Sequence, residues 1–297
     1  MTGSLINLIK LTFCLFVLLL IVSCKQETVI VAADGIIKSK TEMEYRIVLL
    51  ESDKKPSIVN KFKDPVEIIW SSKTEFAYID HQGDVWEVSL SDLSPRLLLN
   101  TGYLRNEDTI GKFILKRNEK KLYYAINSYP PSSVRTYSLN CVPFGGKRRT
   151  LFAGEGRVYA IKQLSDNNIQ MVTSAKTIDI NISSGKIIRS SDNTKGSRII
   201  FHSAHYAAHQ KYDNYRNHVV EIFNHNLIDK PAMHYRMDKG FGIPFDLDES
   251  SMELLLVEVR VSSDKIPDRL VITNTQGTAS EIYRSDIICS ARFLISE

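Results

Sequence analysis

Short apolar stretches alternate with turn residues along most of the chain, and few of them repeat at the 3.6-residue spacing of an α-helix. The clearest unit spans residues 66–99 and divides into four predicted strands, at residues 66–70, 76–79, 85–90 and 96–99. In the third strand Trp86 and Val88 share one face and Glu87 lies on the other, as a half-buried strand requires. Four strands within about 35 residues predict one blade of a β-propeller.

The same unit recurs along the chain. Predicted second strands begin at residues 28, 75, 121, 169, 198 and 253, and predicted fourth strands begin at residues 57, 96, 149, 233 and 281. The match is loosest between residues 175 and 200, where the segment Lys186–Ser191 either closes one blade or opens the next. The recurrence predicts an all-β fold, a six-bladed β-propeller of four-stranded blades.

The two ends of the repeat array complement each other. Residues 292–297 match a first strand, whereas the segment from residue 28 matches a second strand. Pairing them closes the ring and leaves no blade with unpaired inner edges, which would promote aggregation. We therefore predict that residues 28–297 form one domain, in which the sixth blade combines the C-terminal strand with three N-terminal strands at about residues 28–62.

Two segments resemble the TolB-type propeller repeat, in which a strand ending in Trp-Ser-Pro-Asp-Gly precedes a second apolar strand. They are WSSKTEFAYIDHQGDVWEVSL at residues 70–90 and FDLDESSMELLLVEV at residues 245–259. Ser72 and Lys73 stand where the family has Pro-Asp. The resemblance implies a six-bladed propeller on an envelope protein, and it transfers no binding site, because propellers carry unrelated functions.

The first 24 residues have the pattern of an export signal. Lys10 precedes an apolar run from Leu11 to Cys24, which is short for a membrane span of about 20 residues. Its end, Ile21-Val22-Ser23-Cys24, resembles the bacterial lipoprotein box. That resemblance implies a signal peptide at residues 1–23, a lipid such as palmitate on Cys24, and a tether at residues 24–27. Since Lys25 replaces the aspartate that retains lipoproteins in the inner membrane, it also implies an outer-membrane anchor facing the periplasm. The alternative is that Cys24 ends an uncleaved anchor helix.

Composition and charge limit the kinds of binding partner that we expect. The chain is 43% hydrophobic and carries a net charge of only +4, spread along its length, which argues against a nucleic-acid partner. Outside the predicted signal there are two cysteines, Cys141 and Cys289, too few for a disulfide framework in a chain of this size. We expect them to be separate thiols.

Six of the seven histidines lie between His202 and His234. In the repeat scheme His202 ends the second strand of blade four, so residues 203–217 form a long loop insertion whose deletion leaves the fold intact, and such insertions usually carry function or disorder. We predict a partner-binding surface in this loop and in the turn at residues 127–134, comprising His205, Tyr206, His209, Tyr212, Tyr215 and Tyr129. If part of the loop is helical, His202, His205 and His209 share a face and suit a divalent transition metal.

These features predict a lipid-anchored module of the cell envelope that binds or scaffolds a protein or glycan and needs no cofactor. The alternative is a metal-dependent lyase or hydrolase acting on an envelope carbohydrate through the region from His202 to His234. The oligogalacturonate lyase family, which is similar in general architecture, uses histidines in this way. The chain contains no HExxH, no Gly-x-Ser-x-Gly and no phosphate-binding loop.

Overall fold

A computed structural model describes residues 28–294 except residues 53, 101–107, 117, 130–133, 193–197, 203–204, 214–216, 225–229, 238–239 and 260–265, and leaves the side chains of residues 108–112, 198–202 and 212 undescribed. The described residues contain no helix that is long and apolar enough to cross a membrane. Cys24, the signal at residues 1–23 and the tether at residues 24–27 lie outside the described part of the chain.

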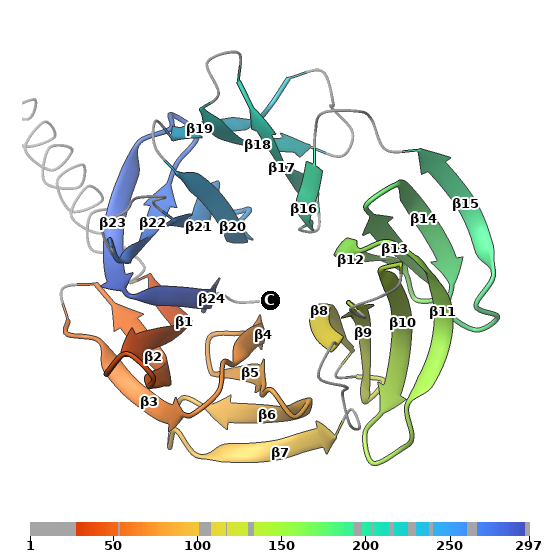
Figure 1. Cartoon of the computed structure of the whole chain (residues 1–297), viewed down its shortest axis with the longest axis horizontal. Coiled ribbons are helices and arrows are strands. Elements are labelled where there is room, and N and C mark those ends of the chain that lie inside the picture. The colour runs from red at the N-terminus through yellow and green to blue at the C-terminus, as the bar shows by residue number, and fades with distance from the viewer. Residues whose placement is uncertain are drawn as a thin grey trace, which may run out of the picture.

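The described strands form six four-stranded antiparallel sheets, the blades of a propeller (Figure 1). Blade one contains β4 (Glu67–Ser71), β5 (Glu75–Ile79), β6 (Asp84–Ser89) and β7 (Pro95–Asn100). Blade two contains β8 (Asp108–Lys116), β9 (Lys121–Ser128), β10 (Thr136–Pro143) and β11 (Arg149–Glu155). Blade three contains β12 (Val158–Ser165), β13 (Asn168–Thr173), β14 (Lys176–Asn181) and β15 (Ile187–Asp192).

The chain continues in the same order through the last three blades. Blade four contains β16 (Arg198–His202), β17 (Tyr206–Tyr212), β18 (His218–Asn224) and β19 (Met233–Met237). Blade five contains β20 (Phe241–Asp248), β21 (Glu253–Val259), β22 (Asp268–Thr273) and β23 (Ala279–Ser285). Blade six contains β24 (Ile287–Phe293), β1 (Val29–Ile37), β2 (Met43–Glu51) and β3 (Ser57–Phe62).

The ring closes as predicted. The innermost strands contact one another in the cycle β24, β4, β8, β12, β16, β20 and back to β24 (Figure 1). In blade six β1 pairs with β24 on one side and with β2 on the other, so N-terminal and C-terminal strands share one sheet. The six-bladed all-β fold is therefore confirmed, although the closing strand begins at Ile287 and not near residue 292.

Blade four departs from the predicted repeat. The segment from residue 198 is β16, the first strand of the blade and not the second, and β17 lies within the stretch that we expected to be a loop. The ambiguous segment near residue 187 is β15, which closes blade three. The other five predicted second strands are β1, β5, β9, β13 and β21, and all five hold that position.

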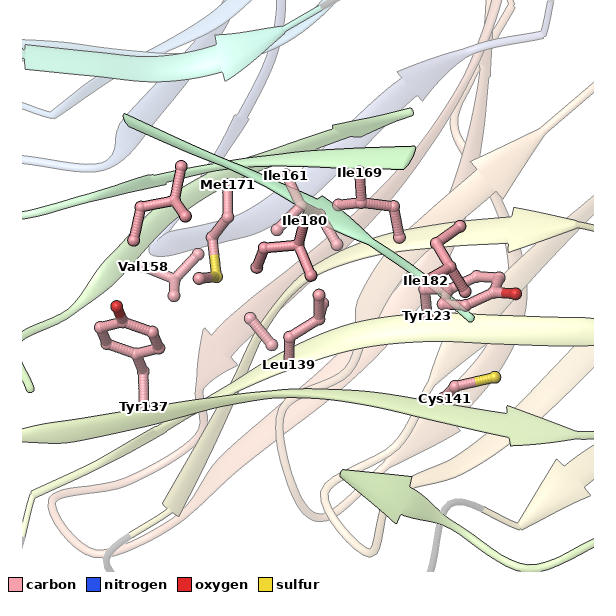
Figure 2. Close-up of a cluster of buried hydrophobic side chains, with 12 residues drawn as sticks. Tyr123, Tyr137, Leu139, Cys141, Val158, Ile161, Ile169, Met171, Ile180 and Ile182 are labelled. Atoms are coloured by element: carbon pink, nitrogen blue, oxygen red, sulfur yellow. The ribbon is translucent and has the colours of Figure 1, made fainter. Parts of the chain in front are cut away.

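Apolar side chains fill the space between most neighbouring blades. The second strand of a blade is buried on both faces, as in β9, because a blade lies on each side of it. Figure 2 shows the cluster between blades two and three, where Leu139 and Tyr137 of β10 pack against Met171 and Ile180. Cys141 belongs to this cluster, and Cys289 lies half-buried in β24; both are free thiols, as predicted.

Polar side chains fix the register between blades. Four polar side chains each accept a hydrogen bond from a backbone N–H on the innermost strand of the next blade. The acceptor and donor residues are Asn127 and Val158, Ser290 and Ile68, Asp268 and Ile288, and His218 and Gly242. An unpaired buried N–H costs free energy, so each of these bonds stabilises one relative position of two blades.

The strand order also defines the two faces of the disc. On one face, here called the crossing face, lie the connections between successive blades, such as residues 156–157, and the turns between second and third strands. On the other, the terminal face, the described chain begins at residue 28 and ends at residue 294, where the Leu294 N–H donates to the Val29 carbonyl at 2.8 Å.

Candidate functional site

The three histidines proposed as metal ligands lie on separate parts of one hairpin. His202 ends β16 opposite Ala207, His205 lies in the turn, and His209 lies within β17 opposite Ile199. The shared helical face that we considered is therefore wrong, because the segment is a strand. The His205 ring nitrogen Nδ1 lies 2.6 Å from Glu249 of blade five, whereas the His209 ring packs against Phe223 with ring centroids 4.9 Å apart.

No group of three or more histidine, cysteine or acidic side chains arranged to hold a metal occurs among the described residues. The His202 side chain is not among them. Metal binding through these histidines stays a prediction, and it now lacks the helical geometry that suggested it.

The expected partner-binding loop is not one surface. Tyr206 begins β17 at the terminal face and packs against the apolar cluster between blades four and five, whereas Tyr212 ends the same strand at the crossing face. Tyr215 lies outside the described residues. Deleting residues 203–217 would remove the second strand of a blade, so the loop assignment is wrong and we now expect this deletion to disrupt the fold.

Side chains of neighbouring strands make the polar sequence of β17 compatible with its position in the sheet. Ala207 and Ala208 are buried, and small apolar residues there allow close approach of the flanking blades. Lys211 pairs with Glu221 of β18 at 2.6 Å, and Gln210 donates to the Gly242 carbonyl of blade five. These contacts satisfy polar groups that a loop would leave to water.

Tyr129, the remaining residue of the predicted surface, belongs to an assembled cluster on the crossing face. The Arg135 guanidinium carbon lies 5.3 Å from the centroid of its ring and that of Arg157 lies 6.0 Å away. Arg157 also lies 5.7 Å from the ring centroid of Tyr159 in β12. We call Tyr129, Arg135, Arg157 and Tyr159 the arginine–tyrosine cluster; it joins blades two and three.

Backbone hydrogen bonds hold this cluster in place. The Gly156 N–H donates to the Arg135 carbonyl at 2.7 Å, and the Ser174 N–H donates to the Arg157 carbonyl at 2.8 Å. Gly156 has φ +108°, and a Cβ there would lie 2.3 Å from Ser174 Oγ, so the turn requires glycine. One residue beyond Arg157, the buried Asn127 side chain bonds both the N–H and the carbonyl of Val158.

The electrostatics of the cluster favour an anion. Arg135 and Arg157 are exposed, and neither takes part in any of the ion pairs seen among the described residues. Guanidinium groups that stack on tyrosine rings keep their N–H donors free for a carboxylate, phosphate or sulfate. The sequence alone points to Tyr129 only, because the two arginines come from separate connections that meet through pairing of β10 with β11.

Comparison with known proteins supports the fold and gives no family. No protein-family model matches the chain, and no curated protein matches its sequence. Among solved structures, the chain resembles an oligogalacturonate lyase from Vibrio parahaemolyticus with a TM-score of 0.50 and 13% identity, over 88% of this chain and 83% of that chain. It also resembles a protein of unknown function from Bacteroides caccae with a TM-score of 0.49 and 11% identity, over 90% of this chain and 99% of that chain. At such identity the first likeness shows a shared propeller fold alone.

Proposed function

We propose that this chain is a lipid-anchored binding module of the cell envelope that holds an anionic group of a protein or glycan partner in its arginine–tyrosine cluster. The observation that carries the proposal is the pair of exposed guanidinium groups of Arg135 and Arg157 beside the ring of Tyr129. Guanidinium donors pair with anionic oxygens, and a tyrosine ring offers a flat apolar face to a sugar or side chain.

The position of the N-terminal strand agrees with this function. The described chain begins at residue 28 on the terminal face, and the cluster lies on the crossing face. A lipid on Cys24, with a tether at residues 24–27, would hold the terminal face toward the outer membrane. The crossing face would then point into the periplasm, where a partner can reach it.

Binding of anionic polymers tests the cluster. We expect the wild-type protein to bind at least one of heparin, alginate and polyphosphate, and to ignore neutral dextran, in titrations at low salt. Loss of both guanidinium groups in the double variant Arg135→Gln, Arg157→Gln should weaken binding by more than about tenfold, since each charge-assisted hydrogen bond contributes about 1.5–3 kcal/mol. Arg148→Gln is the matched control, because Arg148 is exposed and lies in a turn of the terminal face. Equal weakening by the control, or no binding of any of the three polymers, would count against the cluster.

Labelling of cells with palmitate tests the anchor. The wild-type protein should carry the label and Cys24→Ala should not, because Cys24 is the residue that would hold the lipid. A membrane-bound wild type without the label would instead indicate an uncleaved helix.

A further inference from the structure

One of the six boundaries between blades differs from the others. Apolar clusters fill five of them, but among the described side chains no such cluster joins blades three and four. Blade four packs against blade five through one face, and its opposite face, toward blade three, carries Lys211, Glu221 and His234. A Glu221 carboxylate oxygen lies 2.6 Å from the Lys211 ammonium and another lies 3.3 Å from the His234 ring. On blade three the face away from the cluster with blade two carries Gln170 and Asp179, joined by a 2.9 Å hydrogen bond.

Water reaches this polar seam. The side chains of His234 and Lys211 are 52% and 38% exposed, although a neighbouring blade lies on this side of their sheet. Nearer the axis Ala160, Val172 and Ala207 are buried, and the innermost strands β12 and β16 contact each other. The two blades therefore meet near the axis and leave their outer strands apart.

β15, the outermost strand of blade three, is uncovered as well. All six of its residues are exposed, and since successive residues of a strand point to opposite faces, neither face is covered. Ile187 and Ile188 are 48% and 58% exposed. One edge of β15 pairs with β14, and the other is the free edge of the sheet. Ile188 forms a bulge without a partner on β14, and the pairing with β14 is regular from Arg189 to Asp192.

Three of the other outer strands, β7, β19 and β23, are better protected. β7 begins with Pro95, a residue that blocks strand addition. In β19 Met233, Tyr235 and Met237 are buried against blade five, and in β23 Tyr283 bonds Asp34 of blade six. An uncovered edge that exposes isoleucine is a template for another strand.

The charges around β15 favour an acidic strand at its free edge. Lys176, Lys186 and Arg189 surround it, against one exposed acid, Asp192, which lies 3.9 Å from Lys176. Opposite charges on directly facing residues of adjacent strands stabilise pairing, and like charges oppose it.

We propose that β15 is a docking edge for an extended segment of a partner protein, one that carries acidic residues alternating with apolar ones and adds to blade three as a fifth strand. Backbone hydrogen bonds supply the pairing, the exposed isoleucines pack beside apolar residues of the added strand, and Lys186 and Arg189 pair with its carboxylates. This surface is separate from the arginine–tyrosine cluster.

The test uses the full chain in detergent and a fluorescent peptide of alternating glutamate and valine, with a lysine–valine peptide as the charge control. We expect the acidic peptide to bind, the basic peptide not to bind, and the amides of β15 to gain protection from hydrogen exchange. Ile188→Lys and Arg189→Glu should each weaken binding by about tenfold. Ile58→Lys is the matched control, because Ile58 is 47% exposed on the outer strand of blade six, and it should bind as the wild type does.

Three results would overturn the proposal: no binding of the acidic peptide, equal binding by Ile188→Lys and Ile58→Lys, or binding without protection of β15 amides. A concentration-dependent dimer of the wild type that Ile188→Lys abolishes would overturn it as well, and would assign the edge to a second copy of the chain. Circular dichroism and the melting temperature of each variant exclude unfolding as the cause, since both isoleucines and Arg189 are exposed.

Discussion

Replacing Asn127 by alanine should loosen the joint between blades two and three and disturb the arginine–tyrosine cluster with it. The Asn127 side chain is 3% exposed, accepts a 2.7 Å hydrogen bond from the Val158 N–H and donates a 3.3 Å bond to its carbonyl. Alanine leaves this buried N–H without that partner, and Val158 directly follows Arg157 in sequence.

The magnitude follows from the two bonds. An unsatisfied buried polar group costs about 1–3 kcal/mol, and the lost side-chain volume adds to this, so we expect a fall of about 2–3 kcal/mol in the free energy of unfolding. For a domain of this size the melting temperature should fall by roughly 4–12 °C. Urea unfolding followed by the fluorescence of Trp70 and Trp86, the two tryptophans, measures the change.

Asn140→Ala is the matched control for the effect on binding. Asn140 is 1% exposed and bonds Thr150 and Ser138 within blade two, so its loss should destabilise the protein without moving Arg157. Only Asn127→Ala should weaken binding of the anionic polymers under conditions in which both variants are folded. A loss of stability below about 0.5 kcal/mol, or equal binding by the two variants, would refute the reasoning.

Three further predictions concern buried groups. Asp34 is fully buried and accepts hydrogen bonds from Arg46, Tyr283 and Ser285. Asp34→Ala should therefore lower the free energy of unfolding, measured in urea, by about 3–5 kcal/mol. A decrease below about 1 kcal/mol would contradict this assignment. Burial lowers the pKa of His218 from 6.5, so as the pH falls the unfolded chain binds the proton before the folded chain does. The contribution of His218 to the free energy of unfolding should be complete above about pH 7 and be lost as the pH falls through the lowered pKa. His218→Gln should remove this pH dependence, and an equal pH dependence in the variant would disprove it. Burial raises the pKa of Cys289 from 9.0 to about 11, so alkylation at neutral pH should be about a hundredfold slower in the folded than in the unfolded protein, and equal rates would exclude it.

Local pattern placed the second strand correctly in five of the six blades, where that strand is apolar. β5, β9 and β21 read as continuous apolar runs because each lies between two blades, and turn residues mark their ends. The same pattern misplaced β17, whose histidines, glutamine and lysine resemble a solvated loop. Its strand conformation depends on Glu221 and on the Gly242 carbonyl, which come from other strands.

The candidate sites show the same division. Tyr129 was predicted from its position in a long turn, but Arg135 and Arg157 join it only because the Gly156 N–H pairs with the Arg135 carbonyl, which continues the pairing of β10 with β11. Exposed Ile188 gave no signal in the sequence, because an isoleucine in a strand is ordinarily buried.

The sequence by itself determined the number of blades and the closure of the ring, because these depend on alternation of apolar residues, on turn residues and on spacing along the chain. Only the tertiary structure decided which turns meet at the crossing face, which blade boundary is polar and which outer strand stays uncovered. These features depend on contacts between segments distant in sequence, and a periodic pattern carries no information about which side chains of neighbouring repeats will face each other.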